Sequence, residues 1–424
     1  MKSRHLFKLS TLGFIGLLGL AGCGGGSSTP TASSGGTTYT GAASVGDMAE
    51  FTVNGSTLSY NLSGAHFGST SGSLAIQPVN GTSGFYQATA NSQTIGMMLA
   101  GNFGIAIVPN VPDLMNPNAT VNAFVTGLKN ATSNEADVKG KTFLYATYRA
   151  APAAYVLKLN NDNSFVAQPV LDYLSDLTSA GTLNGDPGTS NAVMGCWGAS
   201  SNGNYLNAVL ASDQAVLAAL SGVGGGCGQF DFTANYDTSP ASTSPAYYRF
   251  MIKPGSNRAG LIVDMADGSG FGLGLETTLE SSTPITAAPA SNQLYSAFAA
   301  PNITSINLAT LFNTSTGASP FSEVLLKSDG KVEITPMDCN YSTSPISCAT
   351  GANTTSQIDV HYDTFCYPDT ANPGTFLTAN LPGMACVYKT LNNPGEIYNA
   401  FIDDQDGYFF AASLLAPELV MGAR

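Results

Sequence analysis

The chain has 424 residues, 43% of them apolar, which is enough for one large domain or two to three smaller ones with hydrophobic cores. Only 10% of its residues are charged, and its formal net charge is −13 at pH 7. Such an acidic chain repels phosphate groups, so we expect no nucleic-acid partner and no electrostatic attraction to anionic lipid head groups.

The first 22 residues have the layout of a secretory signal peptide. Lys2, Arg4 and Lys8 form a basic start, an apolar run follows from Leu9 to Leu20, and small residues precede Cys23. The apolar run is too short to span a bilayer comfortably. Removal of this leader would leave 12 basic and 28 acidic residues, a net charge of −16.

The segment Leu20-Ala21-Gly22-Cys23 resembles the lipobox of bacterial lipoproteins. The resemblance implies that residues 1–22 are removed and that Cys23 becomes a lipidated first residue. Its sulfur would carry a diacylglyceryl group as a thioether, and its amino group would carry an acyl chain such as palmitate. In that family Gly24, rather than Asp, implies the outer membrane, with the body facing the periplasm or the cell surface. Several acyl chains satisfy the requirement for stable membrane anchoring. Residues 23–44 are rich in Gly, Ser and Thr and predict a flexible linker.

Beyond the linker, short β-like runs alternate with turn-forming residues, which is typical of an antiparallel all-β protein. A related hairpin occurs three times, at 95–107, 260–275 and 396–412. A strand that ends in proline also recurs, at 73–78, 164–169 and 331–336.

These matches predict repeated antiparallel units with one strand order, at 45–115, 140–285 and 290–420. Closure would protect the edges of so many strands, so we expect barrel-like or sandwich domains, with a small β-propeller as the alternative. A helical stripe of apolar residues over 204–220 predicts a helical insertion on this β scaffold, and Val121–Leu128 is expected to form a helix of a turn or two.

Six cysteines remain beyond Cys23, an even number that predicts three disulfides in an exported chain. Sequential pairing closes the shortest loops. We therefore expect the pairs Cys196–Cys227, Cys339–Cys348 and Cys366–Cys386. The absence of Cys-x-x-Cys spacing, together with only two histidines beyond the leader, argues against a zinc cluster.

One candidate metal or acid–base site is the segment Asp359-Val-His361-Tyr-Asp363. On a regular strand, residues two apart share a face, so the two carboxylates would flank the imidazole. Such a set could bind a divalent metal or exchange protons. The alternative is a solvated strand face beside Cys366.

Two hairpin loops concentrate acidic residues beside glycine, with Asp264 and Asp267 in one and Asp403 and Asp406 in the other. Carboxylates on a tight turn suit Ca²⁺, the one cofactor that the sequence suggests, although neither loop has EF-hand spacing. Turn formation alone is a sufficient alternative explanation, because Asp-Gly is a strong hairpin signal.

The sequence contains no Gly-x-Ser-x-Gly, no His-Glu-x-x-His and no phosphate-binding P-loop. We therefore expect a non-enzymatic, lipid-anchored envelope or surface protein that binds an envelope or extracellular ligand or serves a structural role. The alternative is an envelope enzyme that acts on glycans through paired carboxylates, which would need to lie about 5 to 9 Å apart.

Overall fold

The computed structural model describes residues 36–424. Excepted are 65, 91–92, 113–119, 180–191, 202, 223–225, 231, 233–246, 256, 266–268, 280–283, 301–320, 341–344, 346, 352–356, 394–396 and 416–417. The expected signal peptide at 1–22, the lipidation site at Cys23 and most of the expected linker therefore lie outside the described residues.

The first sheet closes on itself as an eight-stranded antiparallel barrel in which each strand pairs with the next and β1 pairs with β8. Its strands are β1 (Thr37–Ala43), β2 (Met48–Asn54), β3 (Thr57–Gly64), β4 (Gly68–Pro78), β5 (Phe85–Ala90), β6 (Gln93–Ala100), β7 (Phe103–Pro112) and β8 (Thr120–Lys129). This first barrel begins before and ends after the predicted unit 45–115, since it runs from Thr37 to Lys129. The last part of the expected linker, Thr37–Ala43, is strand β1.

The second sheet is also a closed eight-stranded barrel, in which β16 returns to pair with β9. Its strands are β9 (Thr142–Tyr148), β10 (Ala154–Leu159), β11 (Ser164–Pro169), β12 (Val193–Ala199), β13 (Leu206–Leu210), β14 (Tyr247–Lys253), β15 (Gly260–Met265) and β16 (Gly270–Thr277). The short helix η1 (Glu135–Asp137) precedes its first strand. The helices α1 (Val170–Ser179), α2 (Gln214–Leu220) and η2 (Cys227–Gln229) lie in the connections between its strands.

The third sheet closes because β18 pairs with β19 as well as with β17. Its strands are β17 (Gln293–Ala300), β18 (Phe321–Leu326), β19 (Lys331–Asn340), β20 (Ser347–Thr350), β21 (Ile358–Pro368), β22 (Phe376–Tyr388), β23 (Tyr398–Asp403), β24 (Tyr408–Ala412) and β25 (Leu419–Ala423). Eight of these strands form the third barrel, and β20 pairs with the end of β19 that extends beyond the barrel. The barrel-like all-β fold is therefore confirmed, and the propeller alternative is wrong.

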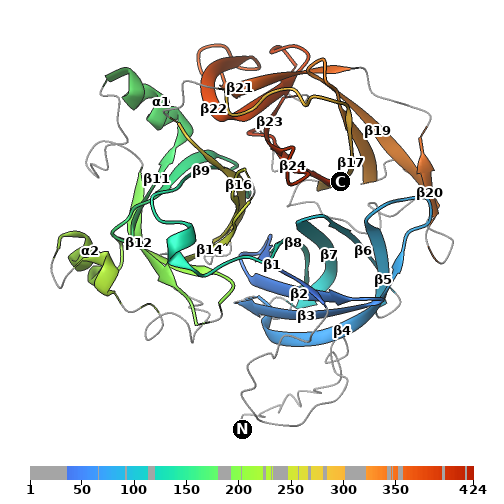
Figure 1. The fold of residues 1–424 in the computed structure, drawn as a ribbon, viewed down its shortest axis with the longest axis horizontal. Helices are drawn as coiled ribbons and strands as arrows, with labels where there is room; N and C mark the ends of the chain where they lie inside the picture. The colour runs from blue at the N-terminus through green and yellow to red at the C-terminus, as the bar shows by residue number, and fades with distance from the viewer. Residues whose placement is uncertain are drawn as a thin grey trace, which may run out of the picture.

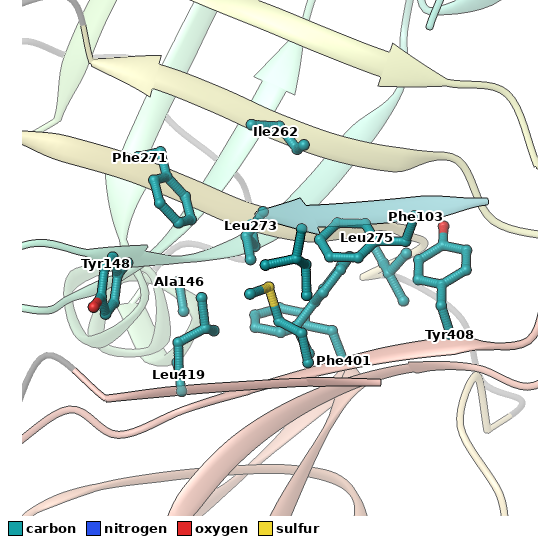
Figure 2. Close-up of a cluster of buried hydrophobic side chains, with 14 of the residues drawn as sticks. Phe103, Ala146, Tyr148, Ile262, Phe271, Leu273, Leu275, Phe401, Tyr408 and Leu419 are labelled. Carbon is teal, nitrogen blue, oxygen red and sulfur yellow. The ribbon is translucent and has the colours of Figure 1, made fainter. Parts of the chain in front are cut away.

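The three barrels surround a common hydrophobic centre, which we call the hub (Figure 1). Phe124 of β8 lies at the meeting point, with its ring centroid 6.2 Å from that of Phe271 in the second barrel and 5.5 Å from that of Phe298 in the third. Figure 2 shows Phe271 and Leu273 of β16 directed toward Phe401 and Leu419 of the third barrel.

Strands at the hub are apolar on both faces, because one face fills a barrel and the other packs against a neighbouring barrel. In β15, Leu261 and Val263 face the barrel interior and Ile262 faces the hub. On the far side of the first barrel, β3 and β4 instead alternate buried or half-buried residues with exposed ones, most of which are polar. The burial of both faces explains why the hub strands have nearly continuous apolar sequences.

The interior of each barrel is filled by pairing large residues with glycine. A Cβ atom at Gly104 would lie 2.7 Å from the ring of Phe51, one at Gly272 would lie 2.6 Å from Tyr145, and one at Gly422 would lie 2.2 Å from Phe409. Small eight-stranded barrels have just enough room for such side chains, and alternation of small and large residues fits them together.

Three of the expectations about local structure need correction. Residues 204–220 are not one helix: Leu206–Leu210 is strand β13, paired with β12 and β14, and only Gln214–Leu220 is helical. Val121–Leu128 lies in strand β8. The apolar residues of both segments are buried within sheets, and short buried strands and helices have similar apolar content.

The third correction concerns the repeated hairpin. All three copies form hairpins, but they occupy the sixth and seventh strands of the first and third barrels and the last two strands of the second. The one strand order expected for the units therefore does not hold for this hairpin. All three copies contribute to the hub, so burial of both faces accounts for their related sequences.

Candidate functional site: acidic joints between the barrels

Asp264 forms a buried ion pair at the interface between the first and second barrels. It lies directly opposite Arg249 in the β14–β15 register, with 2.8 Å between its Oδ2 and the guanidinium Nη1. The guanidinium carbon of Arg249 lies 5.9 Å from the ring centroid of Tyr205, which packs in the hub. Nearby, Asn204 donates a hydrogen bond of 2.9 Å across the same interface to Glu50. Asp267, its expected partner in a calcium or catalytic site, lies outside the described residues.

Asp403 is 1% exposed and shapes the β23–β24 turn. Its Oδ1 accepts hydrogen bonds from the backbone N–H groups of Gln405 (3.2 Å) and Asp406 (3.0 Å). Its Oδ2 is buried with no hydrogen-bond partner among the described residues. Burial raises the pKa of Asp403 above its ordinary value, and the charge of Asp406 adds to this rise, whereas the turn hydrogen bonds and Arg258 oppose it.

Asp406 connects this turn to the other two barrels. Its carboxylate lies 3.8 Å from Nζ of Lys253 in the second barrel, and its backbone carbonyl accepts a hydrogen bond of 3.4 Å from Asn102 in the first. Asp403 and Asp406 therefore form a turn at the place where three barrels meet.

Arg258 is the main polar link between the second and third barrels. Its guanidinium donates hydrogen bonds to the carbonyl oxygens of Glu276 (2.6 Å), Gly383 (2.7 Å) and Ile402 (3.2 Å). Burial lowers the pKa of Arg258 to about 10, and the charge of Asp403 opposes this shift. The sequence offered no signal for this role, because Arg258 lies in a polar loop and its partners are backbone atoms distant in the sequence.

The segment Asp359–Asp363 does not form the regular strand face that the sequence predicted. The register between β21 and β22 shifts between Tyr362 and Thr364, and Asp363 has a φ of 48°, as expected for a bulge. Asp359 is exposed, whereas the ring of His361 stacks on that of Tyr388, with 4.0 Å between centroids.

Asp363 is a joint, by which we mean a hydrogen-bonded link, between the third barrel and the segment of the chain that follows the second barrel. Its carboxylate accepts four hydrogen bonds: from Ile285 N (3.0 Å), Thr286 N (3.0 Å), Thr286 Oγ1 (2.8 Å) and Gly383 N (2.8 Å). Gly383 has a φ of 93° and lies beside Asp363, so the β21–β22 hairpin bends at this point. The carboxylate therefore holds a strand bulge, a bend and the inter-barrel connection together.

The disulfides pair in sequence order, as predicted: Cys196–Cys227, Cys339–Cys348 and Cys366–Cys386. The first ties α2 and η2 to the second barrel. The third lies beside Asn399, whose side chain donates to the Cys366 carbonyl and accepts from its N–H, at 2.8 and 2.9 Å.

The described residues contain no group of three or more His, Cys, Asp or Glu side chains placed to share a metal ion. Among the same residues, no helix has the length and apolar character needed to cross a membrane. Neither a protein-family model nor a curated protein sequence matches the chain.

Proposed function

We propose that the chain is a lipid-anchored protein of the bacterial cell envelope, with a three-barrel body that acts as a non-enzymatic binding or structural module. The leader and the lipobox-like segment that ends at Cys23 support the anchor. The observation that supports a non-enzymatic body is that four candidate carboxylates hold the barrels or their turns together. They are Asp264, Asp363, Asp403 and Asp406. These carboxylates, which the sequence suggested as metal ligands or catalytic groups, stabilise the fold instead.

The competing proposal, a glycan-acting enzyme, has less support. Such an enzyme needs two carboxylates that reach a substrate in a cleft. Asp264 is buried and neutralised by Arg249, and Asp403 is buried and bound by its own turn. Asp406 lies near Lys253, on the surface where barrels meet.

The anchor can be tested by membrane fractionation and mass measurement of the N-terminal peptide of the mature chain. We expect the wild-type chain in the outer-membrane fraction with an acylated Cys23 at its N-terminus. Cys23→Ala should give an unacylated chain that is not retained by detergent micelles. The matched control is Gly24→Asp, which should keep the acylation. By the lipoprotein resemblance, this variant should no longer be found in the outer-membrane fraction. An unmodified, soluble wild-type chain would overturn the proposal.

Protease treatment of intact cells then distinguishes the two orientations. Release of peptides from residues 45–424, with periplasmic marker proteins intact, would indicate display at the cell surface. Protection until the cells are lysed would indicate a body in the periplasm, with envelope partners.

A further inference from the structure

Strand β19 extends beyond the third barrel. Its first half, Lys331–Pro336, pairs with β18 and β21 inside the ring, whereas Met337–Asn340 pairs only with β20. We call the described residues Met337–Asn340 and Ser347–Thr350 the β19–β20 extension. Cys339 and Cys348 lie directly opposite each other in this register and form a disulfide.

The extension docks on the first barrel through backbone contacts. The N–H of Cys348 donates a hydrogen bond of 2.8 Å to the carbonyl of Asn80, and Asn80 forms a parallel bridge with Ser347. Figure 1 shows β20 beside the strands of the first barrel. A Cβ atom at Gly81 would lie 2.0 Å from the carbonyl oxygen of Cys348, so this close approach requires glycine.

The same extension fills the hub between the first and third barrels. Met337 and Cys348 are buried there with Val79 and Phe85 of the first barrel. The ring of Phe85 in turn lies 4.4 Å, centroid to centroid, from that of Phe321 in the third. The position of the extension therefore couples these two barrels.

The three disulfides differ in their access to solvent. The cysteines of the pairs Cys196–Cys227 and Cys366–Cys386 are at most 5% exposed. Cys339, by contrast, is only partly buried, at the place where it packs against the edge of the hub. Because thiol–disulfide exchange needs direct approach of a thiolate to sulfur, access favours attack at Cys339.

We propose that Cys339–Cys348 is a redox modification site, a selectively reducible disulfide that locks the β19–β20 extension onto the first barrel. A thiolate of an external dithiol attacks Sγ of Cys339, forms a mixed disulfide and displaces the thiolate of Cys348, which takes up a proton. The second thiol of the donor then attacks the mixed disulfide and releases Cys339. The chain gains two electrons and two protons, and the donor becomes a disulfide.

The test begins with a titration of the mature chain with dithiothreitol, followed by alkylation and mass mapping of all six cysteines. We expect Cys339 and Cys348 to be labelled at a dithiothreitol concentration at least about tenfold lower than the other four, which serve as internal controls. Labelling of all six together, or of another pair first, would overturn the proposal.

Locking is tested by amide hydrogen exchange of the segment Val79–Phe85 before and after selective reduction. We expect faster exchange after reduction and in the variant Cys339→Ser with Cys348→Ser. Gly81→Ala, which forces the extension away while the cysteines remain, should speed exchange in the same segment without reductant. Unchanged exchange after selective reduction would overturn the locking role.

Discussion

The carboxylate of Asp363 offers the sharpest distinction between a joint and a metal site. If Asp363 holds the connection between barrels, its removal leaves the N–H groups of Ile285, Thr286 and Gly383 without an acceptor. Hydrogen bonds to a charged group are each worth about 1.5–3 kcal/mol, and losing one partner of a buried set costs more than the net bond. The four bonds share one half-buried carboxylate, so we expect Asp363→Ala to cost about 3–5 kcal/mol.

A graded series separates the contributions within this joint. Asp363→Asn keeps the Oδ1 acceptor and tolerates the positive φ, but places an amide donor opposite the N–H of Ile285, so we expect a loss of about 1–2 kcal/mol. Asp359→Ala is the matched control. Asp359 is exposed on the same strand, so its replacement should change stability by less than about 0.5 kcal/mol.

The assay is amide hydrogen exchange of peptides that cover residues 285–286 and 383. A local loss of about 3 kcal/mol corresponds to exchange about 100-fold faster in Asp363→Ala. Equal effects of the Asp359 and Asp363 substitutions, together with a stabilisation of the wild-type chain by added Ca²⁺ or Zn²⁺, would refute this reasoning and restore the metal hypothesis.

Three further predictions test the other polar and packing features. Because the pKa of Asp403 is raised in the folded state, its stabilising contribution is complete below the unfolded-state pKa of about 4 and is lost as the pH rises through the folded-state value. Denaturant titrations should therefore show Asp403→Asn gaining stability relative to wild type between pH 4 and pH 7, and a constant difference would contradict this. Asp264→Ala should lower the free energy of unfolding by about 3–5 kcal/mol, whereas Arg249→Met combined with Asp264→Leu should cost clearly less, and equal losses would argue against a buried ion pair. Gly272→Ala should cost about 1–3 kcal/mol by crowding the interior of the second barrel, whereas Gly228→Ala, where a Cβ atom has room, should cost less than about 0.5 kcal/mol, as measured by the same titrations.

Features encoded by neighbouring residues were predictable from the sequence. The disulfides follow from short loop closure, and Asp406-Gly407 marks the β23–β24 hairpin because these residues suit a tight turn. Alternation and turn residues predicted antiparallel sheets for the same reason. The start of α2 has a local signal that the expected helix over 204–220 did not take into account, since Asp213 accepts from the N–H groups of Ala215 and Val216 as an N-cap.

Features that depend on contacts between barrels were not predictable. The partners of Asp363 are separated from it by 20 to 78 residues, and those of Arg258 include backbone carbonyls up to 144 residues away. Only the assembled structure distinguishes such a carboxylate from a metal ligand. Leu206–Leu210 was assigned to a helix because its apolar residues fit a helical stripe, but in the sheet both of its faces are buried.

The central claim is that the buried polar residues join three barrels into one cooperative body. The most direct measurement is denaturant unfolding followed by fluorescence of Trp197, buried in the second barrel, and by hydrogen exchange of peptides from the first and third. We predict one coincident transition, and Asp363→Ala should shift the Trp197 transition although Asp363 lies in the third barrel. Separate transitions for the three barrels, with the Trp197 midpoint unaffected by Asp363→Ala, would contradict the account.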